Sequence, residues 1–467
     1  MVDLRRRLRS LSFFLYLSFL IVYAAGSADR LLEPPFYNHY SYLADSLLHG
    51  SAELVRAPPH QNDWAVYEGR WYVSFPPVPA ILMMPGVAIW GWDPNARSPV
   101  PASWRSPGTD RGRFRFNEAL FNLLFAPFPP LLLFLVLERL RRSERSTRTQ
   151  SENVLLTCLF GLGTVYFPAA VQADTWHIAH VVGCTFLGLY VLASLEGRHP
   201  VLAGAALGLA FGCRTPMIFA FPFFIYEAAR AQGATRQMDL PAKLRAFVRP
   251  AVLSKLIIFG VIAGAFVLAW LLFNDLRFGD PFDFGHRHLF VRWTPRIERW
   301  GLFDIHYLSR NLAAMLVLTP WIVDEPPYLQ LGYHGLAIWV TTPALLYLLW
   351  PGKRTIDVMD TPPRARRLWP EWRSELLAPL WICVAAVALP SLLYHNTGWM
   401  QFGYRFSNDY MIFLVMLLAV RDRPITRSFR ALVVVSVVVC TFGALTFNRV
   451  SELYHQDLSQ DVFFQPD

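Results

Sequence analysis

Long apolar runs with few or no charges recur along the chain, separated by short polar or basic stretches. A run of about 20 apolar residues is long enough to cross a bilayer as a helix. The pattern predicts an all-α polytopic membrane protein, with residues 1–467 forming a single transmembrane domain. About eleven transmembrane helices are expected, at residues 10–28, 116–137, 154–171, 177–195, 201–212, 216–229, 256–273, 333–350, 376–393, 410–420 and 431–445.

Basic residues indicate the orientation. Most of the 43 Lys and Arg residues lie in the N-terminal tail and in short segments between apolar runs, such as 139–148, 230–255 and 353–373. Short cytoplasmic loops of membrane proteins carry such an excess of positive charge. The N-terminus is therefore expected in the cytoplasm. We interpret the first apolar run as an uncleaved helix, and a signal peptide cut near residues 24–28 is the alternative.

Two long segments between the expected helices are assigned to the outer side. The first extracytoplasmic loop covers residues 29–115, and the second long extracytoplasmic segment covers residues 274–332. Within the first loop, residues 79–90 are apolar, too short to cross the membrane, and bracketed by prolines. They predict an interfacial helix at the outer surface of the bilayer.

The composition narrows the class of protein. Hydrophobic residues make up 54% of the chain and charged residues 16%, whereas a soluble domain averages about 25% charged residues. This excludes an ordinary soluble enzyme, a disordered chain and a coiled coil. The net charge of +9 arises from the loop clusters, so it reflects membrane orientation and predicts no nucleic-acid partner.

Common metal, nucleotide and hydrolase motifs are absent from the sequence. The five cysteines lie within or beside apolar runs without CxxC spacing, so we expect neither disulfides nor a zinc site. The chain contains no Asp-x-Asp, HExxH, P-loop or GxSxG pattern. No metal and no cofactor are predicted, and a nucleotide-sugar enzyme with a metal-diphosphate site is disfavoured.

Several stretches resemble one family of membrane enzymes. They are PPFYNHYSYLADSLLHG and NDWAVYEGRWYVSFPP in the first outer loop, then LAGAALGLAFGCRTP, FNDLRFGDPFDFG and NTGWMQFGYRFSNDY. In this order they are similar to blocks of polyprenyl-phosphate-sugar-dependent glycosyltransferases of the GT-C fold, such as protein O-mannosyltransferases and lipid A aminoarabinose transferases. The resemblance implies inverting transfer of a hexosyl or pentosyl group from a polyprenyl-phosphate-linked donor to a glycan, lipid or protein acceptor at the extracytoplasmic face.

One feature departs from the family pattern. Relatives place an acidic pair ahead of the first amphipathic helix, where this chain has Phe36 and Tyr37. The catalytic base, which takes a proton from the acceptor, must then come from elsewhere or be absent.

Three acids are candidates for the base. Asp63 is favoured because Trp64 and Tyr67 beside it could stack a sugar and raise the basicity of the carboxylate; the alternative is a turn cap. Asp174 is second, with His177 and His180 nearby, and the alternative is an N-cap of the following helix. Asp45 is third and is more simply a polar-face residue. The adjacent acids at 324–325 are interpreted as a solvated loop.

Arginines are the candidates for holding the leaving phosphate. Arg405, preceded by Tyr404, and Arg214, between two apolar runs, would each be costly at a membrane boundary without an anionic partner. Snorkelling to the lipid headgroups is the alternative for both. Arg70 lies near the position where relatives keep a lysine. The remaining histidines at 39, 286, 288 and 395 are interpreted as satisfied interfacial side chains.

Two other classes of function stay open. A transporter or lipid flippase would show ionisable residues within the spans and an internal repeat, and neither is visible here. A GT-C scaffold that has lost its base would explain the missing acidic pair. The Arg-rich composition and the family resemblance suggest a bacterial inner membrane, with the site on the extracytoplasmic face.

Overall fold

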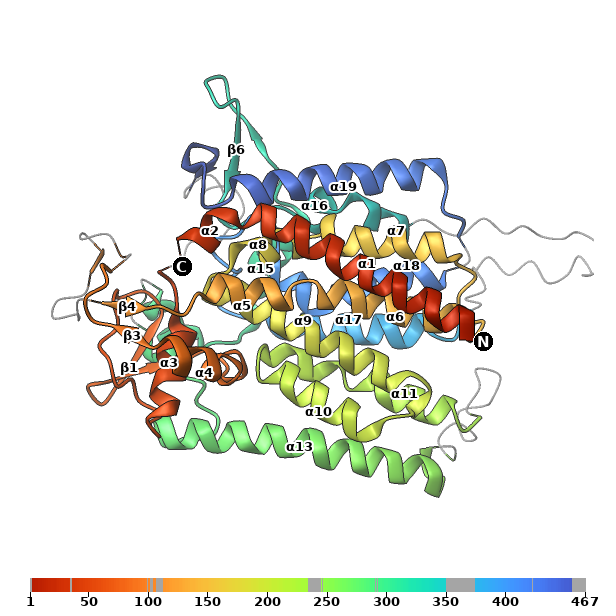
Figure 1. Ribbon diagram of the computed structural model, residues 1–467, viewed down its shortest axis with the longest axis horizontal. Coiled ribbons are helices and arrows are strands. Elements are labelled where there is room, and N and C mark those ends of the chain that lie inside the picture. Colours follow the sequence, from red (N-terminus) through yellow and green to blue (C-terminus); the bar gives the residue numbers. More distant parts are fainter. Residues whose placement is uncertain are drawn as a thin grey trace, which may run out of the picture.

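A computed structural model describes residues 2–33, 36–98, 100, 104–105, 112–233, 245, 247–289, 291, 293–349, 374–421 and 423–455. Long helices lie side by side with roughly parallel axes, and the small strands β1, β3 and β4 gather with α3 at one end of this bundle (Figure 1). Helix α1 begins at the opposite end. The first expected outer loop therefore caps the end of the bundle that is remote from the N-terminus.

The bundle is built from helices of very different lengths. Its members are α1 (Val2–Gly26), α5 (Glu118–Phe125), α6 (Phe128–Arg142), α7 (Gln150–Leu162), α8 (Tyr166–Gln172), α9 (Thr175–Ser194), α10 (Pro200–Phe211), α11 (Pro222–Arg230), α13 (Pro250–Phe278), α17 (Leu377–Leu392), α18 (Asn408–Val420) and α19 (Arg427–Thr446). Every residue of α18 is buried, whereas α13 lies at the periphery with most of its apolar surface exposed.

Four described helices are long and apolar enough to cross a membrane: Glu118–Arg142, Thr175–Gly197, Pro250–Phe278 and Arg427–Thr446. A fifth span is possible if α7 and α8, which are bent by 53° relative to each other, are counted together. These helices are typical of a multi-pass membrane protein.

The expected count of eleven spans is not confirmed. The run at 201–212 forms α10, which has only 12 residues, and the run at 216–229 is divided into the 3-10 helix η3 (Thr215–Ala220) and α11. The run at 333–350 is divided between α16 (Ile338–Thr341) and the 3-10 helix η6 (Pro343–Leu348). An apolar composition indicates only that a segment avoids water. A segment buried in the protein core avoids water just as a membrane-spanning helix does, so composition does not distinguish the two.

The first outer loop forms short, tightly connected elements. Helices α2 (Ala28–Leu32) and α3 (His39–Leu48) precede the antiparallel hairpin of β1 (Trp64–Tyr67) and β2 (Arg70–Val73). The hairpin turns at Glu68 and Gly69, whose φ values of 50° and 76° fit a two-residue turn. Helix α4 (Val78–Trp90) follows at the position of the expected interfacial helix, and β3 (Trp92–Asp93) pairs with β4 (Arg113–Phe114).

The second outer segment starts inside a helix, because α13 continues to Phe278. It then contains the 3-10 helix η4 (His286–His288), α14 (Thr294–Trp300), the 3-10 helix η5 (Ile305–Tyr307) and α15 (Leu308–Leu316). Strand β5 (Trp321–Ile322) pairs with β6 (Leu329–Gly332), which pairs in parallel with β7 (Tyr454–His455). This small sheet ties the segment to the residues that follow α19.

Candidate functional site

A cavity of about 1880 Å³ lies where the outer segments meet the bundle. This exceeds the roughly 300–1,000 Å³ of an ordinary small-molecule pocket. Its polar lining includes Asp63, Asp174, Arg214 and Arg405, which are four of the residues selected from the sequence. One wall is apolar and comes from α10, η3, α13 and the loop after α13, through Phe211, Ile218, Phe219, Trp270 and Phe284.

Asp63 stands in the turn immediately before β1. Its φ of 58° is left-handed, a conformation that Asp tolerates better than most residues. The indole Nε1 of Trp176 donates a hydrogen bond of 2.9 Å to its Oδ2. Burial raises the pKa of Asp63 to about 6, although the Trp176 hydrogen bond and the charge of Arg405 act in the opposite direction. A carboxylate with this pKa is suited to accept a proton near neutral pH.

The aromatic residues around Asp63 differ from those expected. Trp64 points into the core, stacks on His39 with ring centroids 3.9 Å apart, and does not line the cavity. Tyr67 packs against Phe278 and is also outside the lining. Trp64 contacts Tyr42 of α3 and Tyr67 contacts His288 of η4, so both rings of β1 are engaged outside the cavity lining.

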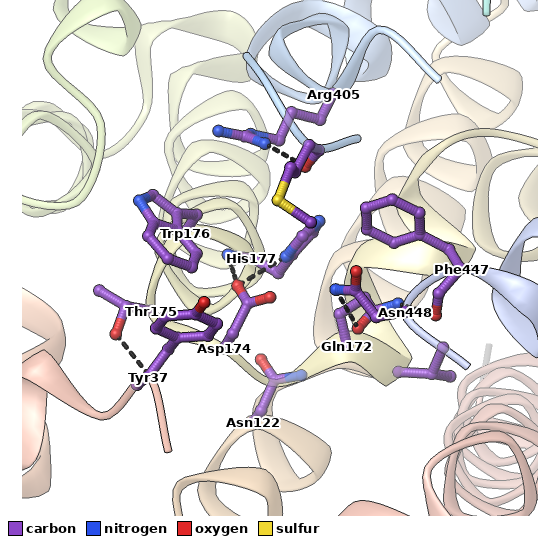
Figure 2. A network of polar contacts seen from close by, with 12 residues as sticks. Tyr37, Asn122, Gln172, Asp174, Thr175, Trp176, His177, Arg405, Phe447 and Asn448 are labelled. Carbon is purple, nitrogen blue, oxygen red and sulfur yellow. Dashed lines mark hydrogen bonds and ion pairs between the residues drawn. The ribbon is translucent and has the colours of Figure 1, made fainter. Parts of the chain in front are cut away.

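Tyr37 and Trp176 provide the aromatic wall instead, with ring centroids 4.9 Å apart. The hydroxyl of Thr175 donates to the backbone carbonyl of Tyr37 at 2.7 Å, which holds Tyr37 beside the start of α9 (Figure 2). Burial and the negative charges of Asp174 and Asp63 raise the pKa of Tyr37 to about 12. The negative charges of Asp63 and Asp174 therefore both stabilise the neutral form of Tyr37. Tyr37 occupies one of the two positions where relatives are expected to have an acidic pair.

Asp174 is the N-cap of α9, as one of the two sequence interpretations expected. Its Oδ1 accepts hydrogen bonds from the backbone N–H of His177 at 3.1 Å and from the Nδ1 of His177 at 2.6 Å (Figure 2). Burial tends to raise the pKa of Asp174, but the charge and hydrogen bonds of His177 outweigh it, so the pKa lies below the usual range. Asp174 lines the cavity as an anion, whereas His177 is buried behind it.

Arg405 belongs to the 3-10 helix η8 (Arg405–Ser407) ahead of α18. Its Nη1 donates to the carbonyls of Gly398 at 2.6 Å and Met400 at 2.9 Å, which fixes the guanidinium without neutralising it. Burial lowers the pKa of Arg405 to about 10, while Asp174 and Asp63 favour its charged form. The side chain therefore carries a positive charge near both carboxylates.

Arg214 and Arg405 both lie over one aromatic ring. The Cζ of Arg214 lies 5.0 Å and that of Arg405 lies 5.6 Å from the ring centroid of Phe406. Arg214 is held by Asp409, with Nη2 donating to Oδ2 at 2.9 Å. Two guanidinium groups facing one cavity make a suitable site for an anion.

Asp409 was not selected from the sequence. It is fully buried in the first turn of α18, where it binds Arg214 and also the Nδ1 of His180 at 2.9 Å. One sequence feature could have identified Asp409, because it is a charged residue at the start of an apolar run. In membrane proteins such a residue usually has a specific partner. His180 is fully buried as well.

Other selected residues lie apart from the cavity. Arg70 is exposed on β2 and pairs with Glu53 at 3.0 Å. Tyr404 is buried in the bundle. Asp45 pairs with Arg56 at 2.9 Å. The acids at 324–325 are exposed.

The histidines divide into two pairs. His286 and His395 line the cavity, whereas His39 and His288 do not. The described residues contain no cluster of three or more His, Cys, Asp or Glu side chains arranged to hold a metal ion.

A second group of polar residues lines the cavity on the side of α1 and α19. Arg30 donates to Gln172 Oε1 at 2.7 Å, and Arg449 binds Asp29 at 2.6 Å. Asn448 completes this group (Figure 2). Sequence reasoning missed it, because its members come from three distant parts of the chain.

No protein-family model matches the chain, and neither does any curated protein. Two solved structures resemble it. They are the Archaeoglobus fulgidus oligosaccharyltransferase in the apo form, at 13% identity and TM-score 0.40, and the oligosaccharyltransferase AglB of the same organism in complex with an inhibitory peptide and a dolichol-phosphate, at 12% identity and TM-score 0.41. Each match covers 94% of this chain and 56% of the solved chain. A likeness of this degree identifies neither the fold family nor the activity, so the function has to follow from the site itself.

Proposed function

We propose that the chain is a membrane glycosyltransferase of the GT-C type. It transfers a hexosyl or pentosyl group, with inversion, from a polyprenyl-phosphate carrier to an acceptor at the extracytoplasmic face of a bacterial inner membrane. The observation that carries the proposal is the composition of the cavity, in which a carboxylate of raised pKa, two guanidinium groups and an apolar wall face one space.

Asp63 is the proposed base. As the acceptor oxygen attacks the anomeric carbon, Asp63 takes the proton of the acceptor hydroxyl, and the bond between that carbon and the phosphate oxygen breaks. The Trp176 hydrogen bond fixes the carboxylate orientation. Asp174 is the weaker candidate, because His177 occupies one of its oxygens and stabilises its ionised form.

Arg405 and Arg214 are proposed to bind the phosphate. Negative charge grows on the phosphate oxygens as the sugar leaves, and fixed cations stabilise that change more than they stabilise the bound donor. Asp409 holds the guanidinium of Arg214 in place from inside the bundle. Both guanidinium groups lie over the ring of Phe406, and both arginines line the cavity.

The remaining lining suits the other parts of a lipid-linked sugar. Tyr37 and Trp176 present aromatic faces near Asp63, where a sugar ring can stack. The apolar wall formed by Phe211, Phe219 and Trp270 offers a surface for the first isoprene units. An amphiphilic cavity of this kind distinguishes a lipid-phosphate donor from a soluble sugar nucleotide.

The test is turnover of synthetic polyprenyl-phosphate sugars by the purified protein in detergent, followed by release of polyprenyl phosphate. Wild type is expected to turn over one donor of a panel, and Asp63→Asn to lose about 10²–10⁴-fold in rate, the usual contribution of a general base. Glu68→Gln is the matched control, because Glu68 is exposed in the neighbouring hairpin turn and does not line the cavity. Its rate should equal that of wild type.

The arginines are tested in the same assay. Arg405→Ala should weaken donor binding and slow release, whereas Arg299→Ala, an exposed arginine on α14, should do neither. Full activity of Asp63→Asn would exclude Asp63 as the base and make Asp174→Asn the decisive variant. Binding of donors without turnover by wild type would instead identify a transporter, a flippase or an inactive scaffold.

A further inference from the structure

The end of the bundle where α1 begins carries a second, smaller pocket of about 430 Å³. It lies between the end of α6, the 3-10 helix η2 (Leu195–Gly197), the end of α11 and the second turn of α13. The charged residues in its lining are Arg145, Glu196, Arg198, Arg230 and Lys255. None of them takes part in the proposed transfer.

The carboxylates of this pocket are already engaged. Glu227 is fully buried beside it and accepts both guanidinium ends of Arg145, at 2.5 and 2.8 Å, and one from Arg230 at 3.4 Å. Glu196 binds Arg139 at 3.3 Å and Arg198 at 2.5 Å. Two carboxylates therefore lie among five cationic side chains, which are Arg139, Arg145, Arg198, Arg230 and Lys255.

Lys255 makes no ion pair with any described residue. It sits in the second turn of α13, and Arg198 opposite it is about half exposed, with 54% of its side chain accessible. Lys255 and the exposed part of the Arg198 guanidinium can receive another anion while the Arg145–Glu227 and Arg198–Glu196 pairs stay intact. A phosphate diester is an anion of suitable charge and size for two such groups.

The framework of the pocket is rigid. Gly197 lies so close to α11 that a Cβ on it would come within 2.8 Å of the Cα of Ala228. Glu196 has a left-handed φ of 63°, and its backbone N–H donates to Glu227 at 2.7 Å. The loop that carries Glu196 and Arg198 is therefore held in one shape by a buried carboxylate.

An apolar surface continues from the pocket along α13. Leu253, Ile257, Ile258 and Val261 are exposed near Lys255, with accessible fractions between 41% and 64%. Their exposure on a membrane-spanning helix indicates contact with lipid chains. A ligand with one anionic group and attached chains would fit both surfaces, whereas a soluble phosphoester would use only the cationic one.

We propose that this pocket binds the headgroup of an anionic phospholipid, with its acyl chains along α13. Cationic pockets between membrane helices on the cytoplasmic side commonly recognise such headgroups. The site is independent of the glycosyltransferase proposal, because its residues and ligand differ from those of the large cavity. The lipid would clamp α13 to α11 and to the loop after α9.

The test compares the full-length protein in nanodiscs of phosphatidylcholine with and without phosphatidylglycerol. Native mass spectrometry then measures the lipid that is retained after transfer to detergent. Wild type is expected to retain phosphatidylglycerol selectively. The double variant Arg198→Ala/Lys255→Ala should lose about ten- to thirtyfold of that preference, as two surface cations would supply.

The matched control is Arg427→Ala/Arg430→Ala, which removes two exposed cations from the start of α19 outside the pocket. It should keep the wild-type preference. Equal losses in both double variants would overturn the proposal in favour of general surface charge, and no loss in either would overturn it outright. If the alanine pair does not fold, Lys255→Gln alone serves the same comparison.

A soluble competitor separates the two sources of phosphate. Glycerophosphoglycerol carries the same phosphate diester without acyl chains, so it should neither displace the retained lipid nor raise the unfolding temperature. Stabilisation by glycerophosphoglycerol equal to that by phosphatidylglycerol would assign the pocket to a soluble phosphoester and overturn the lipid proposal.

Discussion

Two carboxylates in one cavity have opposite electrostatic surroundings. Burial dominates at Asp63 and raises its pKa to about 6, whereas the contacts with His177 dominate at Asp174 and lower its pKa. Such a separation is how a site assigns different tasks to acids of the same type. It favours Asp63 over Asp174 as the proposed proton acceptor, because the Asp174 carboxylate is stabilised as an anion.

The raised pKa of Asp63 predicts a pH-dependent effect on stability. The folded pKa of about 6 exceeds the usual value of 3.8, so the folded state loses stability as pH rises between these values and keeps the full penalty above pH 6. Asp63→Asn removes this cost of burying a charge. Asparagine tolerates the left-handed backbone conformation, and its side-chain oxygen can accept the hydrogen bond from Trp176. The variant should be more stable than wild type at pH 8, by up to about 3 kcal/mol.

Thermal unfolding in detergent at several pH values measures this effect. The advantage of Asp63→Asn should shrink as pH falls below 6 and approach zero below about pH 3, because the wild-type carboxyl is then protonated in both the folded and the unfolded state. An advantage that is independent of pH would show that burial does not perturb Asp63. Glu68→Gln provides the baseline, since its side chain is exposed.

The buried pair of Arg214 and Asp409 predicts strong non-additivity. Asp409→Asn leaves the Arg214 guanidinium without its partner, and breaking a buried pair this way typically costs about 3–5 kcal/mol. The double variant Arg214→Gln/Asp409→Asn removes both charges and should be more stable than Asp409→Asn alone. Unfolding temperatures of the two single variants and the double variant test this expectation. Additive losses would mean that the two side chains do not stabilise each other.

At the scale of elements, close helix packing determines the shape of the apolar wall. Helices α10 and α13 meet through glycines, and a Cβ on Gly208 would lie 2.5 Å from the Cβ of Phe266. Small residues at such contacts let membrane helices approach closely. This contact places Trp270 of α13 beside Phe211 of α10, with ring centroids 4.9 Å apart, where both line the cavity.

Gly208→Ala should therefore destabilise the protein by about 1–3 kcal/mol, the usual cost of overpacking, by pushing α13 away from α10. Gly264→Ala on α13 is the matched control, since no atom lies within 4 Å of its added Cβ. It should be neutral or slightly stabilising. The unfolding temperatures in detergent measure both changes, and equal effects would exclude glycine packing as the cause.

The same packing explains why eleven spans are not confirmed among the described residues. Helices α10 and α18 are apolar like true spans, yet α10 has 12 residues and α18 has 13. Their sequences indicate only that each segment avoids water. Neighbouring helices, which the local sequence does not specify, decide whether a segment meets lipid or protein.

For the molecule as a whole, the two proposals together predict one orientation in the membrane. The cavity and the anionic-lipid pocket lie at opposite ends of the bundle, so the proposal requires them on opposite sides of the bilayer. Asn95 and Thr147 are exposed near the two respective ends. Asn95→Cys should react with a membrane-impermeant maleimide from the outside, and Thr147→Cys only after the membrane is opened.

The five native cysteines give a low background in this experiment, because four are buried and Cys158 is half-buried. Wild type without an added cysteine is the control. Labelling of Thr147→Cys in intact cells, with protection of Asn95→Cys, would reverse the orientation. The catalytic assignment would then have to be reconsidered together with the side on which the donor is presented.

The amino-acid pattern alone indicates the class of environment and the main chemical groups. Its apolar runs cannot be covered by 16% charged residues, so a membrane is required. A charged residue beside an apolar run is energetically costly unless it has a partner or a function. This argument selects Asp63, Asp174, Arg214 and Arg405 from the sequence. Their catalytic and binding roles stay predictions.

Which of these groups meet depends on the packing of the folded chain. Asp63, Asp174 and Arg405 come from separate segments, and Arg214 finds Asp409 at a distance of 195 residues along the chain. The aromatic residues that line the cavity are Tyr37 and Trp176, and not Trp64 and Tyr67 as expected from the sequence. The physical reason is that an amino-acid pattern records the solvent preference of each segment, whereas partners and pKa values depend on neighbours that packing brings together.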